Sequence, residues 1–600
     1  MMRKALTSLL AFAALTGSAE TLTINMADYG VKPDRKENIS AKLTKALDRI
    51  KAEHKGDTLT LRFLAGRYEF HEKGAPCREL YISNHDQDNP KKIGIDIDGW
   101  DNLTIDAEGA DFIFHGRMLP VTVTGSRNFT IKNLHIDFDT PHITQVEVVA
   151  NGEEGITFRT APWVKADIDK KGKFAARGEG WTLTPSSGIA FEKDTRRVVY
   201  RTSDLWIPLD SVVKADDKNL YMAPSWKDGR LKEGTIVAMR GWGRPTPGIF
   251  LSEDSATMIE NVKVHYAEGM GLLAQLCDDI TLKGFGVCLR GEDDPRYFTT
   301  QADATHFSGC RGLISSTGGL YEGMMDDAIN VHGTYLKVTD IKDRRTLTGR
   351  YMHGQSYGFK WGDAGDSIQI ILSETMEALP CRLTIASIVP SDKPTTEGAK
   401  EFTITFNENL PEEVKPGGNF GLENLTWCPE VYFADNTVRN NRARGSLFST
   451  PRKTVVERNL FDHTSGTAIL LCGDCMGWFE TGACRDVTIR NNRFVNALTN
   501  MFQFTEAVIS IYPEIHNLEG QQEYFHSGIR IEENEFDTFD APLLYAKSVD
   551  GLSFTGNKVS HNSAYKPFHK NRFTFRLQRT RNVIIENNDF SGKDPSVSVE

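Results

Sequence analysis

The stretch VTIRNNRF, from Val487 to Phe494, is one copy of a phrase that recurs along this chain. Each copy has a short apolar alternation, then a polar pair that usually contains asparagine, then another apolar residue. Other copies begin near residues 257, 280, 313, 433, 455, 529, 552 and 583. Neighbouring copies start 22 or 23 residues apart where the unit is short, and 31 to 33 apart where it is long.

The period-2 alternation inside each copy predicts a short strand, and the Gly or Asn that follows predicts a turn. Repetition at 20 to 35 residues indicates units that stack on their neighbours. The dense leucine spacing of leucine-rich repeats is missing, and helical periodicity appears only near residues 41–55. We therefore expect an all-β chain that folds as a right-handed parallel β-helix, with Asn or apolar side chains stacked in ladders.

Two stretches lack the phrase and carry hairpin-like patterns instead. Each is about 90 residues or longer, which exceeds ordinary loop length and predicts an inserted small antiparallel β module, barrel-like in character. The expected organisation is a signal peptide at 1–19, the first part of the β-helix at 20–138, a first module at 139–248, coils with the candidate catalytic residues at 249–335, a second module at 336–427 and the last part of the β-helix at 428–600.

Composition narrows the class of protein. The chain has 600 residues, 39% apolar and 25% charged, which is typical of a folded globular protein. Its net charge of -11 disfavours nucleic acid as a partner, because phosphate binding needs a basic surface. Arg3 and Lys4, an apolar stretch to about Leu15 and small residues up to Ala19 are typical of a bacterial signal peptide. We expect an exported protein, periplasmic or secreted, with no membrane span.

The nine cysteines do not form a recognisable framework, because their count is odd and they are spread over a long chain. Cys472, Cys475 and Cys484 lie close in sequence, but no fourth ligand follows at the spacing of a zinc finger. We expect packed thiols or one local disulfide here, with no metal and no cofactor.

Three acids match the repeat. Asp326 and Asp327 lie 23 and 24 residues after Asp303, which is one short coil. Residues one coil apart are stacked about 4.8 Å apart, so the three carboxylates are expected to meet and at least one pKa should rise. A protonated acid beside ionised ones suits glycoside hydrolysis, with the two roles ~6.5–9.5 Å apart in inverting enzymes. Surface turn acids and a calcium site are the alternatives.

Other side chains are candidates for binding a sugar. His306 and His332 follow the acids closely, and a tryptophan ring can stack on the apolar face of a sugar. Carboxylates and guanidinium groups can bind its hydroxyls. The candidates for substrate binding are His306, His332, Arg444, Asp474, Trp478 and Glu480, and Arg452 is a further arginine that can orient hydroxyls or acids.

Four strings carry a resemblance to a known family: QADATHFSGCRG (301–312), EGMMDDAINVHG (322–333), RGSLFSTPR (444–452) and GDCMGWFETGACR (473–485). They resemble glycoside hydrolase family 110, and the resemblance spans nearly the whole mature chain. It implies an exo-acting α-1,3-galactosidase that removes terminal galactose from blood-group B and related glycans with inversion. It also implies a β-helix with inserted β-barrel modules, in agreement with the organisation above.

Polygalacturonase-like β-helix hydrolases are a more distant resemblance. They also use an Asp followed by an Asp-Asp pair about one coil later. By that similarity Asp326 would be the general acid, with Asp303 and Asp327 positioning and deprotonating water. Their Arg-x-Lys triplet for a uronate is not evident, which favours a neutral sugar.

Two other functions remain open at this stage. A polysaccharide lyase on the same fold would hold calcium at the carboxylates. A non-catalytic glycan-binding β-helix adhesin would carry the three acids incidentally.

Overall fold

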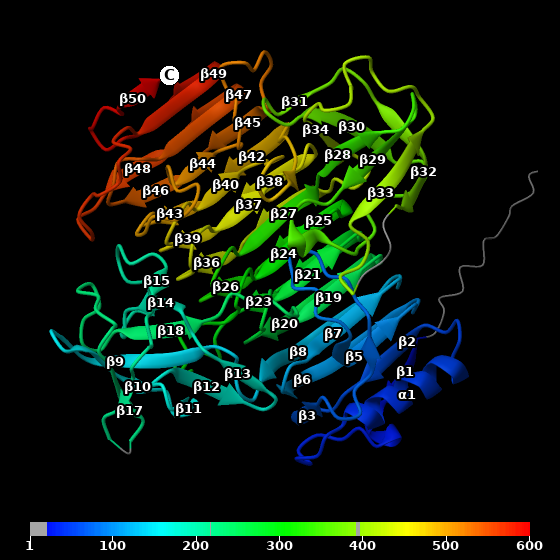
Figure 1. Cartoon of the computed structure of the whole chain (residues 1–600), viewed down its shortest axis with the longest axis vertical. Coiled ribbons are helices and arrows are strands. Elements are labelled where there is room, and N and C mark those ends of the chain that lie inside the picture. The colour runs from blue at the N-terminus through cyan, green and yellow to red at the C-terminus, as the bar shows by residue number, and fades with distance from the viewer. Residues whose placement is uncertain (1–20, 217, 392–395) are drawn as a thin grey trace, which may run out of the picture.

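The computed structural model describes residues 21–216, 218–391 and 396–600, so the expected signal peptide at 1–19 lies outside the described residues. Thirty-three strands form one continuous assembly, and apart from edge pairings such as β4–β5 and β27–β41 these strands pair in parallel. They stack along the long axis of the molecule (Figure 1). The predicted right-handed parallel β-helix is confirmed.

Each coil contributes three short strands, one to each of three parallel faces. The coil that contains Asp303 pairs strand by strand with the next coil, in the order β22 with β25, β23 with β26 and β24 with β27. The bounds are β22 Asp278–Lys283, β23 Gly286–Val287, β24 Thr305–Ser308, β25 Arg311–Thr317, β26 Leu320–Glu322 and β27 Ile329–Thr334.

A buried ladder of asparagines explains the polar pair in the repeated phrase. Every ladder amide except the last donates to the side-chain oxygen of the next Asn, at 2.9 to 3.1 Å, and to a backbone carbonyl. The members are Asn459, Asn492, Asn534, Asn557 and Asn588. In the double asparagines the second enters the ladder, and the first, Asn491 or Asn587, takes the left-handed conformation at φ 54° or 58°.

The apolar residue after the asparagines stacks inside the solenoid. The rings of Phe461 and Phe494 are stacked with centroids 5.1 Å apart, and those of Phe494 and Phe536 lie 4.8 Å apart. Each ring is almost fully buried. The predicted ladders of Asn and apolar side chains are both present, and they hold successive coils in register.

The one α-helix of the described residues, α1 (Ser40–Glu53), packs on the N-terminal coils, where Leu43, Leu47 and Ile50 are buried. It lies beside β1 (Leu22–Asn25) and β2 (Leu59–Arg62) at one end of the solenoid (Figure 1). At the other end the last strands are β49 (Phe575–Glu586) and β50 (Val597–Val599).

The first antiparallel module extends from Thr144 to Arg240. Its main sheet has seven strands in the order β15-β14-β18-β9-β10-β17-β16, and a three-stranded sheet β11-β12-β13 lies beside it. The bounds are β9 Thr144–Gly152, β10 Gly155–Thr160, β11 Lys165–Ile168, β12 Phe174–Gly178, β13 Trp181–Leu183, β14 Ser187–Phe191, β15 Leu205–Trp206, β16 Val213–Lys214, β17 Leu220–Ala223 and β18 Ile236–Arg240.

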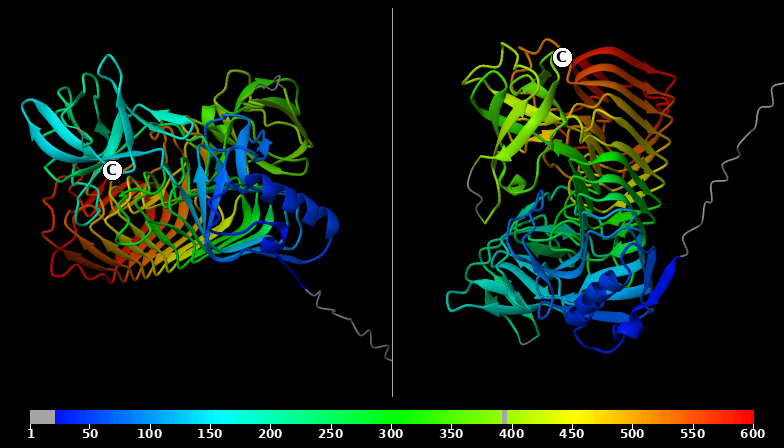
Figure 2. Two further views of the ribbon diagram at one scale, coloured as in Figure 1. Left: turned by 90° about the horizontal axis from the view of Figure 1, so that it is seen from below. Right: turned by 90° about the vertical axis from the view of Figure 1, so that its right-hand side faces the viewer.

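The second module is a closed barrel. Its strands follow the order β30-β32-β33-β29-β28-β34, and pairing of β30 with β34 closes the ring. The bounds are β28 Leu336–Ile341, β29 Thr346–Arg350, β30 Ser367–Leu372, β32 Leu383–Pro390, β33 Glu401–Phe406 and β34 Phe420–Asn424. Both modules stand on the same side of the solenoid (Figure 2).

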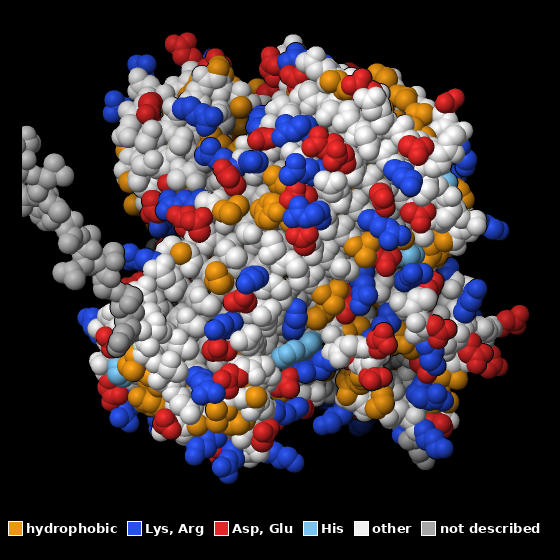
Figure 3. Space-filling view, turned by 180° about the vertical axis from the view of Figure 1, so that it is seen from behind, with side chains coloured by type: hydrophobic (Ala, Val, Ile, Leu, Met, Phe, Trp, Pro, Cys, Tyr) orange, Lys and Arg blue, Asp and Glu red, His pale blue; other side chains and the backbone are white. Residues whose placement is uncertain are grey.

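The opposite side of the molecule carries a mixed surface. Acidic and basic side chains are interspersed there, with small apolar patches between them (Figure 3). Elsewhere in the chain, ion pairs join residues one coil apart, such as Lys283 with Glu260 at 2.7 Å. Among the described residues no helix has the length and apolar character needed to cross a membrane.

Removing one rung of the asparagine ladder should destabilise the solenoid. Asn492→Ala removes the side-chain donor to the buried Val456 carbonyl and the acceptor of the Asn459 N–H and side-chain amide, which costs ~1–3 kcal/mol. We expect a lower urea midpoint for this variant. Asn409→Ala, at an exposed loop position, is the matched control and should change the midpoint little. Equal midpoints for the two variants would contradict the role given to the ladder.

Candidate active site

The register of the coils places three charged residues in one column. Thr305 of β24 pairs with Ile329 of β27, and Ile329 pairs with Ser446 of β37 (Ser446–Phe448). Two residues before these positions stand Asp303, Asp327 and Arg444. Backbone hydrogen bonds continue the register there, since Ala304 N–H donates to the Asp327 carbonyl at 2.7 Å.

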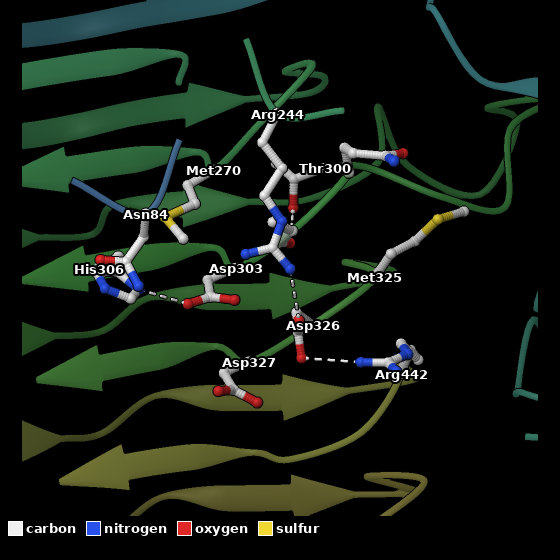
Figure 4. Close-up of polar contacts among 12 residues, drawn as sticks. Asn84, Arg244, Met270, Thr300, Asp303, His306, Met325, Asp326, Asp327 and Arg442 are labelled. Atoms are coloured by element: carbon white, nitrogen blue, oxygen red, sulfur yellow. Dashed lines mark hydrogen bonds and ion pairs between the residues drawn. The ribbon is translucent and has the colours of Figure 1, made fainter. Parts of the chain in front are cut away.

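The structure brings the three aspartates together, as the coil spacing predicts. One carboxylate oxygen from each of Asp303, Asp326 and Asp327 lies within 4.8 Å of the other two. All three residues are buried. Asp303 and Asp327 are stacked on successive coils, while Asp326 lies between Arg244 and Arg442 (Figure 4). Their catalytic role stays a prediction.

Arginines surround these carboxylates. Arg444 donates to both oxygens of Asp327, through Nε at 2.8 Å and Nη2 at 2.9 Å. Asp326 lies 3.1 Å from Arg442 and 3.3 Å from both Arg444 and Arg244. Arg442 is held in turn by Asp204 at 2.6 Å. The site is thus a compact network of three acids and three guanidinium groups.

Arg244, Arg442 and Asp204 are not among the residues that the sequence pattern predicts for the site. Arg244 follows β18 at the end of the first module, and Asp204 lies inside that module, so neither belongs to the repeat. The position of Arg442 can be predicted from the spacing of the coils. If the second module is removed, Arg442 and Arg444 fall one coil after the Asp326-Asp327 pair.

The network separates the pKa values of the three acids. Burial, together with the charge of Asp326, raises the pKa of Asp303 to about 7. Burial also raises the pKa of Asp327 well above its usual range, against the opposing charge of Arg444. Burial acts on Asp326 in the same sense, but the guanidinium groups of Arg442, Arg444 and Arg244 outweigh it and lower its pKa to about 2. Asp326 is therefore ionised at neutral pH. Of the other two, Asp327 is paired with Arg444 through both oxygens, so Asp303 is the member that holds a proton.

A chain of hydrogen bonds connects Asp303 with His306 and His332. The Gly333 carbonyl accepts from His332 Nδ1 at 2.6 Å, so His332 Nε2 in the neutral ring must accept. It accepts from His306 Nε2 at 2.7 Å, which leaves His306 Nδ1 as an acceptor for Asp303 Oδ2 at 2.7 Å. Burial and the neighbouring His332 lower the pKa of His306 far below its usual value, so its ring is neutral.

The same chain offers a route for that proton. If Asp303 becomes ionised, its proton passes through His306 to His332, which then holds protons on both nitrogens. Glu480 lies 3.4 Å from His332 Nε2 and can stabilise that charge. Asn84, from the N-terminal coils, donates to the same Glu480 oxygen at 3.1 Å. His306, His332 and Glu480 are thus connected to Asp303 rather than independent contacts.

The acids open into a small cavity of about 160 Å³. Pockets that hold drug-sized ligands are typically ~300–1,000 Å³, so this cavity fits one sugar ring better than a chain of sugars. The ring of Trp478 lies at its wall and stacks on His353 with centroids 4.3 Å apart. The lining includes Asn84, Arg244, Asn330, Arg442, Arg444, Leu447, Asp474, Trp478, Glu480, Gln503, Phe504 and Glu514 besides the three aspartates.

Asp474 and Arg452, which the sequence suggests as contacts for a sugar or for the acids, make other contacts in the structure. Asp474 lines the cavity, but its carboxylate accepts from the backbone N–H groups of its own loop, including Gly477 at 2.8 Å, so it shapes the loop around Trp478. Arg452 is exposed and lies outside the cavity, where it donates to the Leu425 carbonyl at 3.3 Å. Cys472, Cys475 and Cys484 are buried, unpaired thiols.

The donor set does not suit a calcium ion at the aspartates. Calcium prefers six to eight oxygen ligands, whereas Asp326 and Asp327 already have their oxygens directed at guanidinium groups. A cation bound there would face three positive charges within ion-pairing distance of the acids. The geometry suits instead the acid–base chemistry that carboxylates with separated pKa values can perform.

Comparison with known proteins identifies the family. Residues 144–237 match GLAA-B beta-barrel domain I, and residues 346–418 match GLAA-B beta-barrel domain II. The chain is 61% identical over 593 residues to Alpha-1,3-galactosidase B of Phocaeicola vulgatus, covering 98% of each chain. It is 60% identical over 587 residues to Alpha-1,3-galactosidase B of Bacteroides fragilis, covering 97% of this chain and 98% of the relative.

A more distant relative, Alpha-1,3-galactosidase B of Akkermansia muciniphila, is 37% identical over 96% of this chain and 70% of its own length. The chain therefore belongs to the alpha-1,3-galactosidase family of these relatives. Its class is that of a glycosidase with a carbohydrate substrate, which confirms the broader part of the expected function.

The raised pKa of Asp303 should appear in the pH dependence of stability. The folded protein holds this proton up to about pH 7, whereas the unfolded chain releases it near pH 4. Stability must therefore fall as pH rises through that window. Asp303→Asn keeps a donor for His306 and removes the titration, so its thermal midpoint should fall less than that of the wild type between pH 4.5 and 8.

The control for this measurement is Asp210→Asn, which changes an exposed aspartate of the first module. Its midpoint should follow the wild type at every pH. If the difference in thermal midpoint between the wild type and Asp303→Asn is constant from pH 4.5 to 8, the raised pKa of Asp303 is contradicted.

Proposed function

We propose that this protein is an exo-acting galactosidase that removes terminal α-1,3-linked galactose from glycans such as the blood-group B antigen, with inversion at the anomeric carbon. The observation that carries the proposal is the pair of stacked aspartates with Asp326 beside them, enclosed in a cavity of one-sugar size. Family membership supports galactose as the sugar and α-1,3 as the linkage.

Exo-action is supported by the shape and lining of the site. A cavity of about 160 Å³ admits a terminal sugar ring and leaves the rest of the glycan outside. Trp478 and Phe504 offer apolar faces, and Glu480 offers a polar group for hydroxyls. Arg442 and Arg444 are committed to carboxylates, which supports a neutral sugar rather than a uronate.

The proton donor is proposed to be Asp326, as the resemblance to polygalacturonase-like hydrolases implies. In the free site three arginines keep Asp326 ionised, so a bound sugar has to displace one guanidinium before Asp326 can take up a proton. Asp303 can supply that proton, because its pKa is raised to about 7. Once Asp303 has given up this proton, it becomes the base that deprotonates water.

The stereochemistry rests on the resemblance and not on the spacing of the acids. Inverting enzymes typically hold their two carboxyl groups ~6.5–9.5 Å apart, whereas the nearest oxygens here lie within 4.8 Å. A water must therefore enter beside the pair rather than between widely separated groups. Because short spacing is more usual in retaining enzymes, product stereochemistry is the decisive observation.

Two rival functions make different predictions. A calcium-dependent lyase would lose activity with a chelator and form an unsaturated product that absorbs ultraviolet light. A β-helix adhesin would bind the glycan and release nothing. The guanidinium groups at the acids argue against the first, and the proton-bearing network in the cavity argues against the second.

Release of galactose from a B-type trisaccharide, followed by proton NMR of the anomeric region, tests the proposed reaction. We expect β-galactose to appear first and then mutarotate, with no effect of a chelator. The initial appearance of α-galactose would contradict inversion, and the absence of any free galactose would contradict the proposed function.

Substrates with different leaving groups test the role of Asp326. Asp326→Asn should lower turnover of an α-1,3-linked disaccharide by ~10²–10⁴-fold, because the leaving oxygen then lacks its proton. A dinitrophenyl α-galactoside needs no such proton and should lose far less. Asp303→Asn and Asp327→Asn should lower the turnover of both substrates to a similar extent. If either variant instead loses turnover of the disaccharide but keeps that of the dinitrophenyl galactoside, the residue changed in that variant is the proton donor.

Export remains part of the proposal. It is supported by the order of charged, apolar and small residues before residue 20. Mass spectrometry of the protein recovered from the periplasm or medium should find a new N-terminus after Ala19. Retention of the full N-terminus in the cytoplasm would contradict it.

A further inference from the structure

Two tryptophans of the first module are held in solvent. Trp206 is 73% exposed and Trp242 is 54% exposed, whereas tryptophan is highly buried on average in folded proteins. Trp206 lies on β15, the edge strand of the main sheet, and Trp242 follows β18, which lies two places further into that sheet (Figure 1). Large apolar side chains that gather on a surface often mark a place where something binds.

The main sheet of this module turns one face to the module and the other to the solenoid. Leu205 and Ile207, on either side of Trp206, are buried in the hydrophobic cluster of the module. Trp206 points the other way, because neighbouring residues of a strand alternate between faces. On that other face Ile189 and Ala238 pack into the core of the solenoid. Trp206 is therefore a ring on a fixed strand, and it stands beside the solenoid.

The register of the sheet aligns Trp206 with a buried arginine near the acids. Trp206 pairs with Ser187 of β14, and Ser187 pairs with Arg240 of β18, so the outer two are two strand spacings, or ~10 Å, apart on one face. Arg240 lies 3.5 Å from Asp204, which belongs to the charged network of the site. The ring centroid of Trp242 lies 4.5 Å from the guanidinium carbon of the same Arg240. Both tryptophans thus neighbour one arginine.

Trp242 lies at the mouth of the catalytic cavity. The chain passes from the exposed Trp242 and Gly243 to Arg244, which lines the cavity. Arg244 in turn lies 3.3 Å from Asp326. A proton donor has to reach the leaving oxygen, so the part of the glycan that departs with this oxygen must lie on the side of Asp326. Trp242, two residues before Arg244, stands on that side.

Trp206 borders the same mouth through a loop of the C-terminal coils. Ser203 Oγ donates to the Met501 carbonyl at 2.8 Å, and Gln503 and Phe504 of the same loop line the cavity. Trp206 follows Ser203 by three residues. The two exposed rings therefore flank the way out of the cavity.

We propose that Trp206 and Trp242 bind the sugars to which the terminal galactose is attached, by stacking on the apolar faces of these sugars. This assignment rests on the proposed function, because it takes Asp326 as the proton donor. A cavity of about 160 Å³ holds one sugar ring, so the rest of the glycan has to emerge at the mouth, where the two indole rings are exposed. The tryptophans determine specificity and take no part in the proton transfers.

Two substrates that share the galactose test the proposal. The B-type trisaccharide carries sugars beyond the galactose, whereas α-galactosyl fluoride has a leaving group of one atom that reaches neither ring. Trp206→Ala and Trp242→Ala should each lower kcat/KM for the trisaccharide by ~2–10-fold relative to kcat/KM for the fluoride, which is the value of one aromatic stacking contact. Trp206→Phe and Trp242→Phe keep a ring and should restore most of this ratio.

The matched control is Ile584→Ala, which removes an exposed apolar side chain of β49 and should keep the wild-type ratio. An unchanged ratio in both alanine variants would overturn the proposal. An equal loss for the two substrates would overturn it too, because it would indicate a change in the cavity or in the docking of the module.

Calorimetric titration with the trisaccharide separates this proposal from the proposed activity. In an Asp326→Asn background, which keeps the glycan intact, the added pair Trp206→Ala and Trp242→Ala should weaken binding of the trisaccharide and leave binding of free galactose the same. If the wild type releases no galactose, the proposed function fails, and this comparison of Kd still decides the role of the rings. Equal Kd values for the trisaccharide would overturn that role. A wild-type dimer that the two substitutions convert to a monomer would assign the rings to a contact between copies instead.

Discussion

The ion pair between Arg444 and Asp327, made across two neighbouring coils, is the interaction on which the site depends. Asp327 is fully buried beside Asp326 and Asp303, and buried charges of one sign are costly unless they are paired. Arg444 meets both oxygens of Asp327 at 2.8 and 2.9 Å, in the fork geometry that an arginine matches best. The parallel register of the solenoid places Arg444 beside Asp327, so the pairing does not depend on the conformation of a loop.

That pair explains why the three acids differ although they lie so close together. Arg444, with Arg442 and Arg244, has enough positive charge to keep Asp326 ionised. The remaining two carboxyls cannot both ionise as well in a buried site, and because Asp327 is paired with Arg444 the proton stays on Asp303. The hydrogen bonds from Asp303 through His306 and His332 to the Gly333 carbonyl agree with this when His332 is neutral, because Asp303 is then the donor to His306.

Much of the fold was accessible from the sequence because one coil repeats its local pattern. The strand–asparagine–phenylalanine phrase specifies which residues stack, and the spacing of Asp303 from Asp326 and Asp327 follows from it. The contributions of Arg244 and Asp204 were not accessible, because they come from a module whose docking depends on tertiary packing. Arg442 was hidden by the inserted barrel, which lengthens the sequence separation of two neighbouring coils from about 23 to 117 residues.

The sequence also suggested Asp474 and Arg452 as contacts for a sugar or for the acids, whereas in the structure both make contacts with the backbone. Short polar residues in a glycine-containing loop satisfy their own backbone, as Asp474 does, and that use cannot be told from sugar binding by residue type alone. Arg452 lies only eight residues after Arg444, yet it points away from the cavity because the chain has crossed a coil face between them.

The central claim is that these three carboxylates, gathered by coil register, release a terminal galactose. Galactose release from a B-type trisaccharide should be measured for the wild type and for the triple variant Asp303→Asn, Asp326→Asn, Asp327→Asn, with circular dichroism as a check of folding. We expect the wild type to release galactose and the folded triple variant to release none that is detectable. Comparable release by both proteins would contradict the account.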